Sequence, residues 1–289
     1  MIFNTVFPVF FIIALGWLLA KFKHLNLGAV SDIILYVTTP CLIFSSLLRN
    51  QIVLSDFLTI SLSVLAVTSG CGLATWAFLR FSRRECRGLY LPVMFMNAGN
   101  MALPLALLAF GPEGLSKAVI YYVSSVFLTY SLGILIVSPH RDWAEVFRLP
   151  LIYAAGLGVL LGSLRIPLNP TLVKPFEILG GAAIPLMLLS LGYRLHYSKF
   201  EEPHLALIGS LLRIGLGFAI AWALVTFFSI QGTSRPVILL SSSMPSAVVN
   251  FILAQRYNRN PEVVASVILA TSLLSLITTP AVLALATRR

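Results

Sequence analysis

Two polar interruptions lie inside apolar stretches of the sequence, and they contain the residues best suited to bind a ligand. The first, MNAGNMALP, occupies residues 96–104 within an apolar run from Leu89 to Phe110. The second, SSSMPSAVVN, occupies residues 241–250, again midway through an apolar run. Hydrocarbon penalises unpaired polar groups by several kcal/mol each, so a membrane helix keeps them only where protein or a water-filled cavity satisfies them. We therefore predict that each interruption unwinds a membrane helix at a binding site.

The side chains of the two interruptions supply hydrogen-bond donors and acceptors but no charge. Asparagine amides and serine hydroxyls can hold a small polar ligand, Gly99 allows the backbone to bend, and a proline removes an N–H. Where each broken helix restarts, its free N–H groups carry partial positive charge, which favours a small organic anion over a cation. The substrate-binding residues predicted in this way are Asn97, Gly99, Asn100, Pro104, Ser241, Ser242, Ser243, Pro245, Ser246 and Asn250.

The same interruptions also fit a structural interpretation, in which they are kinks in packed helices whose small polar residues are hydrogen-bonded within the bundle. Glycine and proline are common in membrane helices. Two interruptions at related positions in the chain nevertheless favour a binding site, because paired breaks are typical of transporters.

Three ionisable residues lie in or beside apolar segments. Asp32 and Glu177 stand near the entry ends of two segments, where they are candidates for proton coupling or for hydrated helix ends. Arg213 lies within another segment, where it could attract an anion or extend to the cytoplasmic interface.

The remaining polar side chains predict no catalytic or metal site. The histidines lie in loops or at segment ends without partners at metal-ligand spacing, and the cysteines form no CxxC pair. No HExxH, GxSxG or Walker A motif is present. We therefore expect no enzyme and no cofactor, whereas coupling to protons or sodium stays open. The histidines are His24, His140, His196 and His204, and the cysteines are Cys41, Cys71 and Cys86.

The composition is that of an integral membrane protein. The 289 residues are 58% hydrophobic and 10% charged, and the mean hydropathy is +0.93, whereas a soluble domain carries about 25% charged residues. The net charge of +10 does not predict nucleic-acid binding, because the basic residues are scattered over short loops. Residues 2–20 lack a basic start and are followed by Lys21 and Lys23, which predicts a first membrane helix and not a cleaved signal peptide.

Ten apolar segments have about the 20 residues that a membrane helix needs. If the N-terminus faces outside, twelve lysines and arginines lie inside and seven outside, so the positive-inside rule predicts both termini outside. The seven include Arg49, Arg165, Arg288 and Arg289, and the twelve include Arg141, Arg194 and the cluster Arg80, Arg83, Arg84 and Arg87. The predicted segments are 3–20, 30–48, 57–79, 89–110, 117–137, 149–165, 171–191, 205–228, 236–255 and 263–285.

The two halves of the chain resemble each other at an offset near 144 residues. Because each copy has five segments, the second must enter the membrane from the opposite side, which makes these inverted-topology repeats, a signature of secondary transporters. We predict residues 1–140 as the first five-helix repeat and 141–289 as the second. The matches include Asp32 with Glu177, Pro40 with Pro185, Ser45 with Ser190, Trp76 with Trp222, Pro92 with Pro236, and NAGNM with SSSMP.

The sequence resembles the auxin efflux carrier family, and within it a bacterial member. The resemblance rests on NAGNMALPLALLAFG and on SSSMPSAVVNFILAQRYNRNPEVVASVILATSLLSLITTP, and it extends over essentially the whole chain. It implies a fold similar to plant PIN-type carriers, bile-acid transporters and sodium–proton antiporters, in which helices four and nine unwind and cross at the midplane. The crossover positions of the family fall on Asn97, Gly99, Asn100 and Pro104, and on Met244, Pro245 and Ser246.

The resemblance further implies a scaffold of helices 1, 2, 6 and 7, a moving transport domain of helices 3–5 and 8–10, and a homodimer through helices 2 and 7. Plant members export auxin, and bacterial members are associated with small carboxylates such as malonate and malate. This chain lacks the long cytoplasmic loop of large plant carriers, so regulation through that loop does not carry over.

The function that these observations favour is secondary transport of a small organic anion, a carboxylate, across the bacterial cytoplasmic membrane by alternating access. An anion channel of the same architecture is one alternative, and it would show no counterflow. A non-transporting membrane sensor is another. An intramembrane enzyme is the weakest, because the sequence offers no nucleophile–base pair.

Overall fold

The computed structural model describes residues 2–49, 54–138, 147–164 and 168–287. Within these ranges the chain is helical, and its β-pairing is a single isolated bridge. Features of the sequence that lie outside the described residues are the predicted repeat boundary at 140/141 with His140 and Arg141, and the orientation residues Arg165, Arg288 and Arg289.

Seven apolar helices in the described part of the chain are long enough to cross a bilayer, so the chain is a multi-pass membrane protein. Six coincide with predicted segments, and the seventh, Ala98–Val137, covers most of the predicted fourth and all of the fifth. The predicted sixth segment is a shorter helix, and the predicted ninth is split into two short helices. The other long helices are Phe3–Phe22, Leu27–Arg49, Leu54–Ser82, Pro170–His196, Pro203–Phe227 and Pro261–Ala286.

Helix boundaries follow local chemistry. The side chain of Asn26 accepts the N–H groups of Gly28 and Ala29 and so caps the first turn of α2. Asn169 caps α10 in the same way, and Pro170 takes the first helical position, where a missing N–H costs nothing. In chain order the α-helices are α1 (Ile2–Phe22), α2 (Leu27–Ile33), α3 (Thr39–Arg49), α4 (Leu54–Ser82), α5 (Tyr90–Met94), α6 (Leu103–Leu128), α7 (Ile134–Val137), α9 (Pro150–Ser163), α10 (Pro170–His196), α11 (Pro203–Ser210), α12 (Gly217–Phe227), α13 (Ser234–Ser242), α14 (Val249–Arg256) and α15 (Pro261–Ala286).

Short 3₁₀ and π segments join several of these helices. A π turn in a long helix often marks strain or a functional site. The 3₁₀ segment is η2 (Arg87–Leu89), and the π segments are η1 (Ile34–Thr38), η3 (Ala98–Ala102), η4 (Thr129–Gly133) and η5 (Leu211–Leu216).

The long helix Ala98–Val137 turns back on itself at Gly111. Gly111 has φ +67°, a backbone conformation that glycine adopts without steric cost. A Cβ built on Gly99 would lie 2.8 Å from the ring of Tyr122, whereas on a straight helix these residues would be about 35 Å apart. Residues 98–110 and 112–137 are therefore two antiparallel segments.

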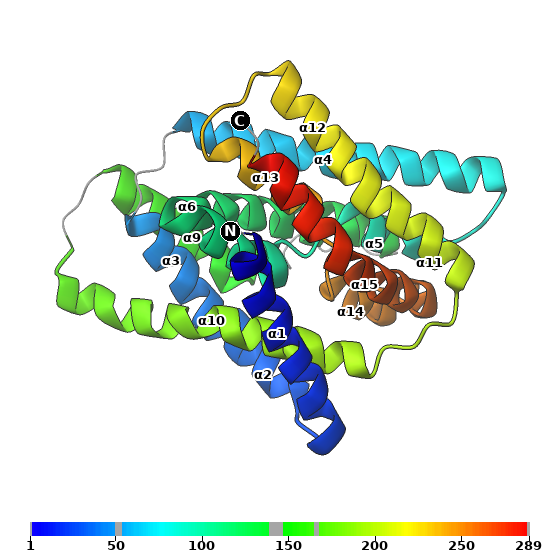
Figure 1. The fold of residues 1–289 in the computed structure, drawn as a ribbon, viewed down its shortest axis with the longest axis horizontal. Helices are drawn as coiled ribbons and strands as arrows, with labels where there is room; N and C mark the ends of the chain where they lie inside the picture. The colour runs from blue at the N-terminus through cyan, green and yellow to red at the C-terminus, as the bar shows by residue number, and fades with distance from the viewer. Residues whose placement is uncertain (1, 50–53, 139–146, 165–167, 288–289) are drawn as a thin grey trace.

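The helices pack in two groups. Helices α1, α2, α3, α9 and α10 pack mainly against one another, and α4 to α7 pack with α11 to α15. In Figure 1, α1, α2 and α10 lie in the lower part of the view and α4, α12 and α13 in the upper part. Within the first group, a Cβ on Gly192 of α10 would overlap the backbone carbonyl of Ile13 on α1, so these two helices approach as closely as small residues allow in membranes.

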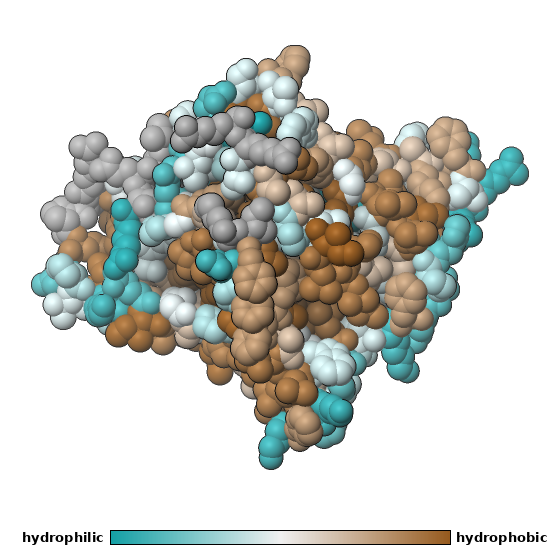
Figure 2. Space-filling view, in the orientation of Figure 1, coloured by the Kyte–Doolittle hydropathy of each residue, from teal (hydrophilic) through white to brown (hydrophobic). Residues whose placement is uncertain are grey.

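Large apolar side chains cover the outside of the bundle. Phe3, Phe7 and Phe11 stack along α1 with ring centroids 5.1 and 5.6 Å apart, and each is at least half exposed. Figure 2 shows hydrophobic residues across the middle of one face and hydrophilic residues toward its edges. Such a surface would be costly in water and suits contact with lipid.

Contacts between helix ends define one face of the bundle, called the basic face below. The hydroxyl of Tyr193 donates to the carbonyl of Lys23 at 3.0 Å, which joins the ends of α10 and α1. The N–H of Glu201 donates to Ser266 Oγ at 3.0 Å, which joins the α10–α11 link to α15. The α4–α5 link meets the start of α15 through Gly88 and Asn260. The basic residues of these links and helix ends are Lys21, Lys23, Arg83, Arg84, Arg87, Arg194, Lys199 and Arg259.

The opposite face holds ion pairs between the other helix ends. Lys117 Nζ lies 3.4 Å from Asp56 Oδ2, and Ser234 Oγ donates to Asp56 Oδ1 at 2.8 Å. Arg49 at the end of α3 pairs with Glu177 near the start of α10. Helices α4 and α10 therefore each run from this face to the basic face.

Candidate functional site

Both predicted interruptions are breaks in helices. Helix α5 ends at Met94, Phe95 is extended with φ −111° and ψ 113°, and the chain becomes helical again at Ala98. Helix α13 ends at Ser242, and α14 begins at Val249. Each break thus places a helix C-terminus and a new helix N-terminus in the interior of the bundle.

The two broken segments cross and hydrogen-bond to each other. The N–H of Asn97 donates to the carbonyl of Pro245 at 2.7 Å, and the N–H of Ala247 donates to the carbonyl of Phe95 at 3.1 Å. These bonds form the isolated antiparallel bridge of the fold. Backbone groups that each helix releases by unwinding are satisfied by the other, so the crossing is tolerated at membrane depth.

Arg213 lies at this crossing and is fully buried. Its Nη1 donates to the carbonyls of Val93 at 2.8 Å and Met94 at 3.0 Å, and its Nη2 donates to that of Ser242 at 2.7 Å. These carbonyls terminate α5 and α13, and a helix C-terminus carries up to about half a negative charge. The two ends together offset the guanidinium charge. Arg213 therefore holds the crossing and does not extend to the cytoplasmic interface, and a part in attracting an anion stays a prediction.

A cavity of about 190 Å³, called the crossing pocket below, lies beside the crossing and between the two helix groups. Met96, Asn97, Gly99 and Asn100 line it from the first interruption, and the apolar residues 247–249 line it from the second. Hydroxyl groups line it from the remaining sides, and they belong to Ser31, Thr39, Tyr122, Ser125, Thr129, Tyr130 and Ser190.

Asn97 uses one end of its side chain for the fold and leaves the other unpaired. Its Oδ1 accepts the N–H of Asn100 at 3.1 Å and so caps the restarted helix. Its Nδ2 has no hydrogen-bond partner among the described residues, although the residue is only 3% exposed. Thr39 Oγ1, also on the pocket wall, is buried and unpartnered in the same sense. Buried donors of this kind call for an explanation, and a bound acceptor supplies one.

Pro104 and Gly99 shape the restarted helix. Pro104 offers no N–H to the carbonyl of Asn100, and the first turn is the wide π turn η3, in which the N–H of Leu103 donates to the carbonyl of Ala98. The sequence predicts that Gly99 allows the backbone to bend, but its φ lies outside the positive region, so no left-handed conformation requires a glycine there. Gly99 is instead a point of close contact with the ring of Tyr122.

We expect Gly99→Ala to lower transport several-fold while the protein still folds. The added methyl would stand 2.8 Å from Tyr122 and displace its ring, which lines the crossing pocket. Gly181→Ala is the matched control, because a Cβ there meets nothing within 4 Å. Uptake into proteoliposomes measures the difference, and equal rates for the two variants would contradict the role of this contact.

The polar residues of the second interruption lie at the crossing, and they are absent from the wall of the crossing pocket. Ser242 Oγ bonds to the hydroxyl of Tyr121 at 2.8 Å, and Asn250 Nδ2 donates to the carbonyl of Phe95 at 2.8 Å and to Ser246 Oγ at 3.0 Å. Their present contacts join the two broken segments, and their part as substrate ligands stays a prediction. The predicted residues that lie off this wall are Pro104, Ser241, Ser242, Ser243, Met244, Pro245, Ser246 and Asn250.

Asp32 and Glu177 also lie away from the crossing pocket. Glu177 is held by Arg49, with Lys174 at 3.7 Å, near the start of α10. Asp32 is exposed on α2. No carboxylate is found among the described residues that line the pocket. A coupling role for either residue stays a prediction.

Arg194 is a pocket residue that the sequence reasoning did not identify. It lies in the last turn of α10, lines the crossing pocket, and donates from Nη2 to Ser31 Oγ at 2.7 Å. The internal repeat contained a signal that could have identified Arg194. The offset of 145 residues that relates Asp32 to Glu177 also relates Arg49 to Arg194.

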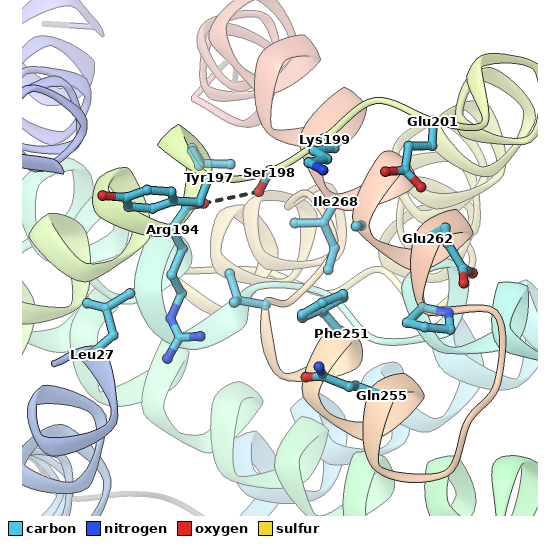
Figure 3. Close-up of a pocket in the computed structure, with 14 residues that line it drawn as sticks. Leu27, Arg194, Tyr197, Ser198, Lys199, Glu201, Phe251, Gln255, Glu262 and Ile268 are labelled. Carbon is cyan, nitrogen blue, oxygen red and sulfur yellow. Dashed lines mark hydrogen bonds between the residues drawn. The ribbon is translucent and has the colours of Figure 1, made fainter. Parts of the chain in front are cut away.

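A second cavity, called the vestibule below, has a volume of about 450 Å³ and lies at the basic face. Its polar lining includes Arg194, Lys199, Glu201 and Glu262 (Figure 3). Arg194 and Val248 line both the vestibule and the crossing pocket. The two cavities therefore adjoin, and the vestibule lies on the side of the crossing pocket that is nearer the basic face.

The cysteines and the other metal-ligating residues of the described chain do not gather into a site. Cys41, Cys71 and Cys86 are free and buried, and burial raises the pKa of the Cys86 thiol in the α4–α5 link. Within the described ranges, no group of three or more histidine, cysteine, aspartate or glutamate residues is placed to hold a metal ion.

Comparison with known proteins identifies the family. The family described as membrane transport protein matches residues 1–146 and again residues 140–283. An uncharacterized transporter of Methanothermobacter thermautotrophicus is 28% identical, with 96% of each chain covered, and one of Methanocaldococcus jannaschii is 26% identical, with 95% of each covered. Auxin efflux carrier component 8 of Arabidopsis thaliana is 27% identical over 48% of this chain and 40% of its own length. The family resemblance found in the sequence is thereby confirmed, whereas a bacterial origin stays a prediction, and the chain belongs to the membrane transport protein family, that of the auxin efflux carriers.

Proposed function

We propose that this protein is a secondary carrier for a small organic anion, which binds in the crossing pocket. One observation carries the proposal: the pocket wall joins a helix N-terminus, the unpartnered Asn97 Nδ2 and an arginine, without a carboxylate among its described residues. A helix start and amide donors suit a carboxylate. A cation would find no counter-charge among the described residues of this wall.

The position of the pocket between the two helix groups supports alternating access. In this proposal α1, α2, α3, α9 and α10 form the scaffold, and the other helices form the moving transport domain. The vestibule shares Arg194 and Val248 with the pocket, and in this proposal it is the substrate's path to the basic face, which the positive-inside rule assigns to the cytoplasm. The structure then corresponds to an inward-open state, with both termini outside.

Ten passes in two inverted five-helix repeats complete the proposal. Helix α5 together with residues 98–110 supplies one pass, residues 112–137 supply the next, and α13 and α14 together supply another. Helix ends that alternate between the basic face and the opposite face support this count. Location in the bacterial cytoplasmic membrane and a homodimer through the second and seventh passes stay predictions from the sequence.

Counterflow in proteoliposomes tests the proposal. Vesicles are preloaded in turn with malonate, malate, succinate, lactate or indole-3-acetate, and uptake of the labelled acid is followed with and without a pH gradient. The indole acid is included because one relative is named an auxin efflux carrier component. We expect saturable exchange with at least one acid.

Two other outcomes would favour the alternatives. Labelled uptake that is neither saturable nor accelerated by preloading would indicate an anion channel. No uptake of any acid by protein that is folded and inserted would contradict the carboxylate assignment and favour a membrane sensor.

A further inference from the structure

We propose that Arg194 binds the charged group of the substrate anion where the vestibule meets the crossing pocket. The inference rests on the proposed function, since it names the residue that selects an anion at that same site. Arg194 and Val248 are the two described residues that line both cavities, and of these two only Arg194 carries a charge.

The charge of Arg194 is left available for a ligand. It is the one charged side chain among the described residues that line the crossing pocket. Its Nη2 donates to Ser31 Oγ, a neutral acceptor, and no described carboxylate forms an ion pair with it. A guanidinium has five N–H donors in a planar fork that fits a carboxylate, so the single bond to Ser31 leaves donors for an anion.

The repeat counterpart of Arg194 shows the contrast. Arg49 occupies the matching position in the first repeat, and Glu177 neutralises it at the opposite face. The repeat counterpart of Glu177 is Asp32, which follows Ser31 but makes no ion pair with Arg194 in the described chain. Of two arginines at equivalent positions, one is thus paired at the surface and the other faces a cavity.

The acidic residues of the vestibule do not neutralise Arg194 either. In Figure 3, Arg194 and Leu27 lie on one side of the cavity, Glu201 and Glu262 lie on the other, and Ile268 and Phe251 stand between them. These apolar side chains separate the guanidinium from both carboxylates, so its positive charge remains available to attract an anion. An acid that enters from the basic face meets Arg194 before it reaches Asn97.

Ligand-dependent thermal stability of the purified full-length protein tests the inference. Lactate, malonate and indole-3-acetate are titrated as sodium salts against sodium chloride at equal ionic strength. We expect Arg194→Gln to weaken the apparent affinity for the stabilising acid about ten- to a hundredfold, since it removes a charged hydrogen-bond donor. Arg194→Lys keeps the positive charge but not the planar fork of donors, so its apparent affinity for the acid should fall less than that of Arg194→Gln. The apparent affinity of the matched control Arg49→Gln should stay within about twofold of that of the unchanged chain, because Arg49 lines neither cavity.

A second measurement uses the unchanged chain and so does not depend on the folding of a variant. Phenylglyoxal modifies accessible arginines, and mass spectrometry reports the extent at each site. We expect the acid to protect Arg194 and leave the modification of Arg49 unchanged. Undiminished affinity of Arg194→Gln, or no protection of Arg194, overturns this inference alone. If no acid stabilises the unchanged chain, the inference and the proposed function both fall.

Discussion

Arg213→Gln is expected to abolish transport and to lower the thermal stability of the protein. The substitution removes a guanidinium that three carbonyls share at 2.7 to 3.0 Å. A glutamine amide can reach at most two of them, and it leaves two helix C-termini facing each other without a counter-charge. Each buried carbonyl left unpaired costs about 1 to 3 kcal/mol, so the broken helices would no longer be held where they cross.

Two variants separate this effect from a general loss of positive charge. Arg213→Lys keeps the charge but cannot span both helix ends with a planar fork. We therefore expect its melting temperature and its uptake rate to lie between those of the unchanged chain and of Arg213→Gln. Arg80→Gln removes an exposed arginine near the end of α4 and should change neither property. The measurements are melting temperature in detergent and initial uptake in proteoliposomes. An Arg213→Gln protein that melts normally would show that Arg213 does not hold the crossing.

Asn97→Asp is expected to reduce anion uptake a hundredfold or more while the protein remains folded. An aspartate can still accept the N–H of Asn100 and cap the restarted helix, as Asn97 Oδ1 does at 3.1 Å. It replaces the unpartnered Nδ2 donor with a negative charge on the pocket wall. Two like charges about 4 Å apart repel by about 4 kcal/mol at an effective dielectric constant of 20, so the substrate anion should be excluded.

The control for Asn97→Asp is the same change at an exposed helix start. Asn26 caps α2 through its Oδ1, outside both cavities, so Asn26→Asp should leave uptake unchanged. Asn97→Ser, which keeps a cap acceptor and loses the amide, should give an intermediate rate. If Asn97→Asp has a normal melting temperature and normal uptake, the anion does not bind beside Asn97.

Features that depend on local composition could be predicted from the sequence. Apolar runs of bilayer length and the break at MNAGNMALP follow from the cost of polar groups in hydrocarbon. Family membership followed from the motifs around Asn97 and Ser241. The turn at Gly111 falls between the predicted segments 89–110 and 117–137, which hydropathy alone separates.

The roles of Arg213 and Arg194 were decided only by the tertiary structure. In the sequence, Arg213 is one basic residue in an apolar run, and its partners Val93 and Ser242 belong to different helices. Arg194 counted only toward membrane orientation, although its repeat counterpart Arg49 forms an ion pair and it does not. Hydropathy and spacing are local properties of the chain. Which buried carbonyl, carboxylate or cavity a charged side chain meets depends instead on how distant segments pack, and the bonded residues here lie between 29 and 163 positions apart. That packing decides whether a charge holds the fold or remains available for a substrate.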